Sequence, residues 1–112
     1  MKDELTLNEY QRKALKTAVY GKDSKINYPI LGLVGEAGEL ANKYKKVLRD
    51  DGGVLSDTKK EELIMELSDV LWYCAALAQD LDTDLNTIAN RNIEKLLDRK
   101  KRNVIQGSGD NR

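Results

Sequence analysis

The sequence contains no histidine and no phenylalanine, and it has a single cysteine and a single proline. Without histidine, the chain cannot form Ser-His or Cys-His nucleophilic sites, histidine-ligated zinc sites or the Glu-x-x-His helices of di-iron carboxylate bundles. A lone cysteine excludes an internal disulfide, and we interpret Cys74 as an inert core thiol. Any catalysis therefore depends on carboxylates, lysine, arginine, tyrosine, hydroxyl groups or a metal ion with oxygen ligands.

The sequence also lacks net charge, because 19 Lys and Arg residues balance 19 Asp and Glu residues. Binding to nucleic acid or to a membrane surface normally needs an excess of basic residues, so we expect neither partner. No stretch approaches the roughly 18 apolar residues of a membrane span. The opening residues, Met1–Leu5, contain no apolar signal-peptide core, which favours a cytoplasmic protein. The 112 residues are enough for one domain, residues 1–112, with one core.

The spacing of apolar residues predicts an all-α fold, a compact helical bundle of four main helices. Capping-box patterns mark the first and third helices, at Thr6-x-x-Glu9 and Thr58-x-x-Glu61. Pro29 fits the first turn of the second helix. The predicted bounds are about 6–20, 29–48 and 58–81, then a fourth helix that is capped at Asp82 or Thr83 and reaches about Arg102, and last an irregular tail over residues 103–112.

Acidic residues on the third predicted helix lie within its apolar surface. With about 100° of rotation per residue, Glu66, Asp69 and Tyr73 fall on one narrow stripe that has apolar side chains on both flanks. An ordinary amphipathic helix keeps its acids opposite the apolar face. Because a buried carboxylate without a partner is costly, we expect cations close to this stripe.

The second predicted helix has a similar acidic edge, where Glu36 and Glu39 border the apolar arc. Three glycines lie inside this helix, and each costs about 1 kcal/mol of helix stability relative to alanine. We therefore expect a neighbouring helix or a ligand to approach the backbone closely at these glycines, which are Gly32, Gly35 and Gly38.

The fourth predicted helix has a cationic edge beside its apolar arc. Asn92, Lys95 and Arg99 fall on this edge. Lysine and arginine in such a place are suited to gripping phosphate. Together with the two acidic edges, this edge gives the chain polar groups of both signs next to its predicted core.

The acidic edges of the two helices suggest a metal site. Two antiparallel helices that face each other would gather four carboxylates around one pocket: Glu36, Glu39, Glu66 and Asp69. Oxygen ligands without histidine or thiolate favour Mg²⁺ or Mn²⁺, and Mg²⁺ completes its shell with water and substrate phosphates. The same acids would alternatively form salt bridges with Lys43, Lys95 and Arg99 in a non-enzymatic helical oligomer or interaction module. Both interpretations stay open at this point.

The acidic pairs and the residues around them resemble a known family. Gly35-Glu36-Ala37-Gly38-Glu39 followed by Glu66-Leu67-Ser68-Asp69 is similar to the Glu-x-x-Glu, spacer, Glu-x-x-Asp signature of the MazG-like nucleotide pyrophosphohydrolases. The resemblance covers the chain from about Tyr10 to the end, including Tyr28–Leu33, Asp69–Tyr73, Asn92-x-x-Lys95-x-x-x-Arg99 and Gly107–Arg112.

This resemblance implies a function and a set of roles. It implies a Mg²⁺-dependent enzyme that hydrolyses nucleoside triphosphates to the monophosphate and pyrophosphate, in nucleotide-pool house-cleaning. The implied metal ligands are Glu36, Glu39, Glu66 and Asp69, with Glu39 as one candidate for the general base, and the implied substrate-binding residues are Asn92, Lys95 and Arg99 for phosphate and Tyr73 for the base or sugar. The family's usual dimers or tetramers imply that oligomerisation completes the bundle. A phosphoribosyl-ATP pyrophosphohydrolase or a dUTP- or dCTP-specific enzyme remains an alternative.

Overall fold

The computed structural model describes residues 4–112, which contain helices and turns and no strand. The expectation for Met1–Leu5 falls partly on residues 1–3, which lie outside this range. None of the helices in the described range is both long enough and apolar enough to cross a bilayer. The predicted all-α class with four main helices is confirmed: α1 Leu7–Ala14, α2 Asn27–Asp50, α3 Asp57–Asp80 and α4 Leu85–Lys101, with short 3-10 helices at Leu15–Thr17 and Lys22–Ser24.

The first capping box forms as predicted. Thr6 Oγ1 accepts from the backbone N–H of Glu9 at 3.0 Å, and Glu9 Oε1 accepts from the Thr6 N–H at 3.3 Å. The α-helix is shorter than expected, because it tightens into a 3-10 turn after Ala14 and the chain turns extended at Ala18. Pro29 does lie in the first turn of α2.

The caps of α3 and α4 differ from the prediction. Ser56, rather than Thr58, caps α3 by accepting from the Lys59 N–H at 3.1 Å. Asp84 caps α4 by accepting from the Thr87 N–H at 2.8 Å. Asp82 cannot take this role, because it has a left-handed φ of 59° in the turn that ends α3. Each observed cap lies within two residues of the predicted one.

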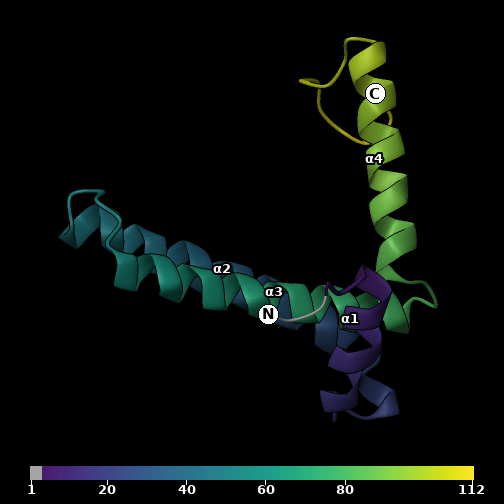
Figure 1. Cartoon of the computed structure of the whole chain (residues 1–112), viewed down its shortest axis with the longest axis horizontal. Coiled ribbons are helices and arrows are strands. Elements are labelled where there is room, and N and C mark those ends of the chain that lie inside the picture. Colours follow the sequence, from purple (N-terminus) through teal and green to yellow (C-terminus); the bar gives the residue numbers. More distant parts are fainter. Residues whose placement is uncertain (1–3) are drawn as a thin grey trace.

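Helices α2 and α3 lie side by side as a hairpin, and α1 packs across α3 (Figure 1). Trp72 on α3 fixes the end of α1, because its indole N–H donates to Thr17 Oγ1 at 2.9 Å and to the Ala14 carbonyl at 3.2 Å. The Trp72 side chain therefore ties α1 to α3. The hairpin is the rigid frame on which the acidic residues lie.

A buried glutamine sets the direction in which α4 leaves α3. Gln11 on α1 accepts from the Leu85 N–H at 2.8 Å, while its amide group donates to Gln79 Oε1 at 3.1 Å and to the Thr83 carbonyl at 3.2 Å. Asn8 adds a second link by accepting from the Asn86 N–H at 3.0 Å. Held in this way at its first residues, α4 points away from the α2–α3 hairpin (Figure 1).

One chain alone does not close the predicted bundle. Its radius of gyration is 17.0 Å, against about 13 Å for a globular chain of about this length. Large apolar side chains are exposed on two helices, with Leu67 of α3 at 55% and Ile93 and Leu97 of α4 at 54% and 63%. Completion of the bundle by a second copy stays a prediction.

Candidate functional site

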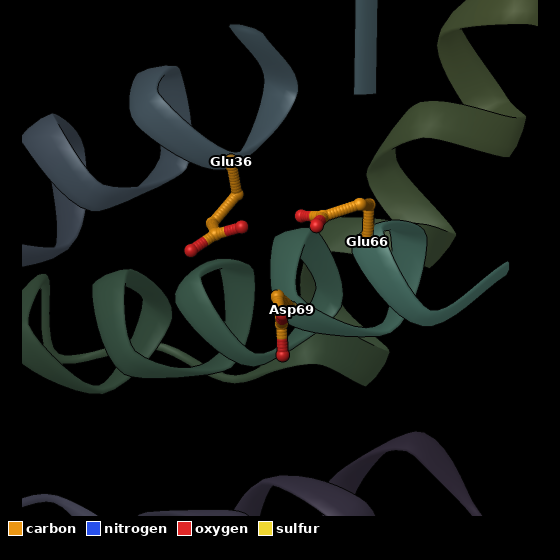
Figure 2. A group of neighbouring side chains, drawn as sticks. All are labelled: Glu36, Glu66 and Asp69. Carbon is orange, nitrogen blue, oxygen red and sulfur yellow. The ribbon is translucent and has the colours of Figure 1, made fainter. Parts of the chain in front are cut away.

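Three carboxylates from α2 and α3 converge at the hairpin. Glu36, Glu66 and Asp69 each offer an oxygen atom, and these oxygens lie within 4.8 Å of one another. Figure 2 shows Glu36 reaching from α2 toward the α3 residues Glu66 and Asp69. The fourth residue predicted for this group, Glu39, is exposed on α2 and lies outside it. The structure therefore brings together three of the four predicted metal ligands.

Glu66 is a largely enclosed member of this acidic cluster, with its side chain 14% exposed. Lys43 Nζ lies 2.8 Å from Glu66 Oε1, and this contact lowers the pKa of Glu66 below its ordinary value. The other oxygen, Oε2, is buried and accepts no hydrogen bond from the described residues. A buried acceptor without a partner is uncommon and costly in folded proteins. The unpaired Oε2 is therefore an acceptor that another electropositive group would satisfy.

The charge of the acidic cluster is not balanced. The pKa of Glu36 is raised above its ordinary value, mainly because the protonated form would donate a hydrogen bond to Glu66. Partial burial and the negative charges of Glu66 and Asp69 raise it further. Lys43 supplies one positive charge close to these acids. A divalent cation would neutralise the remaining charge, and three carboxylates match the hard oxygen ligands of Mg²⁺ or Mn²⁺. The residues present therefore fit such an ion.

Mg²⁺ should raise the melting temperature of the protein by several degrees, because an ion that binds only the folded state stabilises it. Glu36→Gln should melt at a higher temperature than the wild type in metal-free buffer, since it removes one of the mutually repelling charges. The same variant should lose most of the shift with Mg²⁺. Differential scanning calorimetry with and without Mg²⁺ checks this, with Glu61→Gln, an exposed acid on α3, as control. An unchanged Mg²⁺ shift in Glu36→Gln would contradict the metal site.

Tyr73 lies against the backbone of α2, one turn beyond Asp69. A Cβ atom at Gly32 would overlap the Tyr73 ring, so the expected close approach to the backbone is confirmed there. At Gly35 and Gly38 a close approach by a neighbouring helix is wrong, because none of the described residues lies within 4 Å of a Cβ at either position, and an approach by a ligand there stays a prediction. The ring is also 6.1 Å from Tyr28, centroid to centroid, and burial raises the Tyr73 pKa. Tyr73 is thus held at the edge of the acidic cluster by its packing.

Two neighbouring glycines should respond in opposite ways to the same substitution. Gly32→Ala forces Tyr73 or α2 to move, and overpacking of this kind costs about 1–3 kcal/mol. Gly35→Ala meets open space and should stabilise the helix by about 0.5–1 kcal/mol. Urea unfolding of the two variants measures both effects, and equal changes in stability would contradict the packing of Tyr73 on Gly32.

The cationic edge of α4 lies apart from these acids. Lys95 and Arg99 make ion pairs with Asp110 in the C-terminal tail rather than with Glu66 or Asp69. Asn92 and Lys95 line a shallow groove of about 260 Å³ on α4. The salt bridges that the alternative interpretation expected from Lys95 and Arg99 to the acids of the two helices are therefore wrong within one chain. The salt bridge that it expected from Lys43 is present, to Glu66.

Residues 27–104 match the family model described as the MazG nucleotide pyrophosphohydrolase domain. This match contains α2, α3 and α4 and therefore both the acidic cluster and the cationic edge. The chain belongs to the MazG nucleotide pyrophosphohydrolase family. The Gene 37 protein of Mycobacterium phage L5 is similar, with 50% identity over 109 residues that cover 92% of this chain and 96% of that protein. No solved structure matches the chain significantly.

Sequence reasoning missed two polar residues outside the matched MazG domain. Gln11 bonds α1 to the junction of α3 and α4, and a long polar side chain beside the apolar positions of α1 was the available signal. Asp110 lies in the segment expected to be an irregular tail, yet it contacts two of the three phosphate-binding candidates, Lys95 and Arg99. The position of Asp110 could not be predicted from helical periodicity, because it depends on how the residues after α4 fold back onto that helix.

Proposed function

We propose that this MazG-family chain is a metal-dependent nucleoside triphosphate pyrophosphohydrolase, which converts a (d)NTP and water to the (d)NMP and pyrophosphate. The observation on which the proposal rests is the acidic cluster, three carboxylates within 4.8 Å with one buried oxygen unpaired. Family membership supports the reaction class. Nucleotide-pool house-cleaning in the cytoplasm is the role we propose for this activity.

The acidic residues would hold the metal ion, and the remaining residues would place the substrate. Glu36, Glu66 and Asp69 are the ligands we propose for Mg²⁺, with Mn²⁺ as a substitute. When bound, such an ion supplies a Lewis acid that neutralises triphosphate charge and lowers the pKa of a water molecule. Glu39, exposed one turn after Glu36, remains the candidate general base. Tyr73 would contact the base or sugar from its fixed position beside Gly32.

We also propose that the enzyme works as a homodimer or homotetramer. With a rise of about 1.5 Å per residue, Lys95 and Arg99 lie about 15 and 21 Å along α4 from Leu85. Because Gln11 fixes α4 at that end and α4 points away from the hairpin (Figure 1), the cations of a chain do not face its own acids. A second copy would cover the exposed apolar side chains of α3 and α4 and bring its Asn92, Lys95 and Arg99, the residues we propose to bind the substrate phosphates, toward the acids of the first.

A different class of function has one observation in its favour. The Lys43–Glu66 ion pair is the contact expected of a non-enzymatic helical oligomer, in which acids and bases stabilise packing. In that case the acidic cluster would bind neither a divalent ion nor a nucleotide. The convergence of Glu36 and Asp69 on Glu66 favours the enzyme, because three acids beside one paired lysine leave negative charge that a divalent cation would neutralise.

A product-resolved assay tests the proposal directly. The common and damaged dNTPs and NTPs, together with phosphoribosyl-ATP, are incubated with the protein and Mg²⁺, and the products are separated by ion-exchange chromatography. We expect monophosphate and pyrophosphate, and no turnover in EDTA. Diphosphate with orthophosphate, or no turnover of any substrate, would contradict the proposed reaction. Turnover of phosphoribosyl-ATP, dUTP or dCTP alone would assign one of the specific alternatives.

A further inference from the structure

Residues 103–112 turn back and pack against the second half of α4 (Figure 1), and we call this segment the clasp. The guanidinium of Arg112 donates to the carbonyls of Val104 at 3.0 Å and Ile105 at 3.1 Å, and also to that of Gly109. Arg102 of α4 donates to the Arg112 carbonyl oxygen at 2.7 Å. These four contacts join the tail to itself and to the helix.

Gly107 permits this turn, because a Cβ at that position would lie 2.7 Å from Arg112 Cδ and 3.3 Å from the Val104 carbonyl oxygen. The backbone N–H of Val104 also donates to the Arg99 carbonyl at 2.9 Å, so the clasp starts directly from the end of α4. The tail is thus built to a defined shape that determines where the intervening residues lie.

The clasp places Asp110 over the two cations of α4. Asp110 Oδ1 lies 3.2 Å from Lys95 Nζ and 3.0 Å from Arg99 Nη2, so both ion pairs end on the same oxygen. The Arg99 side chain is only 5% exposed, whereas that of Asp110 is 81% exposed. The carboxylate therefore lies between the buried guanidinium and the solvent. An anion that approaches this guanidinium from solution meets Asp110 first.

We propose that Asp110 is an internal competitor for phosphate, whose carboxylate takes the place of a phosphate oxygen on Lys95 and Arg99 and thereby sets the affinity of this site. The inference rests on the proposed function, which assigns phosphate binding to these two cations. Two cations that share one carboxylate oxygen present the arrangement that also suits a phosphate oxygen. Asp110 lies outside residues 27–104, so the match to the family model does not include this contact.

The competition is of a strength that substrate can overcome. Asp110 itself is 81% exposed and its pair with Lys95 is open to solvent, and exposed ion pairs contribute little because solvent screens them. A pyrophosphate or triphosphate group has several negative charges and brings more oxygens to the same cations than one carboxylate does. The bound phosphate would displace the Asp110 side chain while the Arg112 contacts keep the rest of the tail in place.

Binding of inorganic pyrophosphate to the full-length protein tests the inference. Isothermal titration calorimetry in EDTA at physiological ionic strength compares the wild type with Asp110→Asn, Asp110→Ser and Lys95→Gln. Both Asp110 variants should bind pyrophosphate about two- to tenfold more tightly, since they lose a contact of the surface ion-pair class. Lys95→Gln should bind it more weakly. Glu94→Gln, an exposed acid on α4, controls for the general effect of removing one negative charge.

The substrate KM should fall by the same factor in both Asp110 variants, because an internal competitor lowers the affinity for every displacing anion equally. Weaker or unchanged pyrophosphate binding in both variants, or tightening no greater than in Glu94→Gln, would overturn the competitor role while leaving the proposed function intact. Unchanged binding and KM in Lys95→Gln would instead show that these cations hold no phosphate, and the phosphate site of the proposed function would then fail. Thermal melting confirms that each variant is folded.

Discussion

Glu66→Gln will lower the rate of pyrophosphate release by at least about 100-fold, since even outer partners of a metal ligand typically cost 10–100-fold when removed. Glu66 is a largely enclosed carboxylate of the acidic cluster with an unpaired buried oxygen, so its replacement removes a direct ligand of the proposed ion. Glutamine has nearly the same shape and leaves the helix packing unchanged. The measurement is steady-state turnover of a dNTP with saturating Mg²⁺, followed by pyrophosphate release.

Two controls separate chemistry from folding in this experiment. Glu61→Gln changes an exposed acid on the same helix and should keep wild-type turnover. Lys43→Met removes the cation that pairs with Glu66 without removing a carboxylate, so it should retain Mg²⁺ binding. Wild-type turnover in Glu66→Gln would refute the assignment of the acidic cluster as the catalytic metal site.

The elements of the fold could be predicted because they depend on short-range sequence patterns. The capping box at Thr6 and Glu9 and the helix around Pro29 involve only residues within one turn of each other. The predicted caps of α3 and α4 were wrong by one or two residues, because several polar residues near the start of each helix are able to cap it, and Ser56 and Asp84 do so. The spacing of apolar residues does not show which of these polar residues caps the helix. That depends on the path of the chain just before the helix begins.

The candidate site was predicted less completely because it depends on how helices rotate against each other. The spacing of Glu66 and Asp69 places them on one face of any helix, and they do meet Glu36. Glu39 shares its edge with Glu36 on a helical wheel, but in the structure it is exposed and lies outside the acidic cluster. The residues Asn92, Lys95 and Arg99 share a face of α4 as expected. Their distance from the acids follows from hydrogen bonds of Gln11, which no local pattern shows.

The separation of the acids from the cations has a consequence for how the enzyme would be assembled. If the acids of one copy work with the α4 cations of another, each complete site contains residues from two chains. A variant that lacks one of the acids and a variant that lacks one of the cations would then restore a complete site when mixed. Asp69→Asn and Lys95→Gln suit this purpose, because both residues are exposed and their replacement leaves the packing intact.

Co-refolding equal amounts of Asp69→Asn and Lys95→Gln should restore activity well above that of either variant alone. In a symmetric dimer with two shared sites, half of the randomly paired dimers are mixed, and each mixed dimer contains one intact site, so roughly a quarter of wild-type activity is expected. Mixing Asp69→Asn with Glu66→Gln is the matched control, because both lesions then fall in the acidic cluster and no pairing yields an intact site. Size-exclusion chromatography with light scattering establishes that mixed oligomers form. Mixed oligomers without recovered activity would show that each chain supplies its own acids and cations, which would require α4 to swing from the direction that Gln11 now gives it.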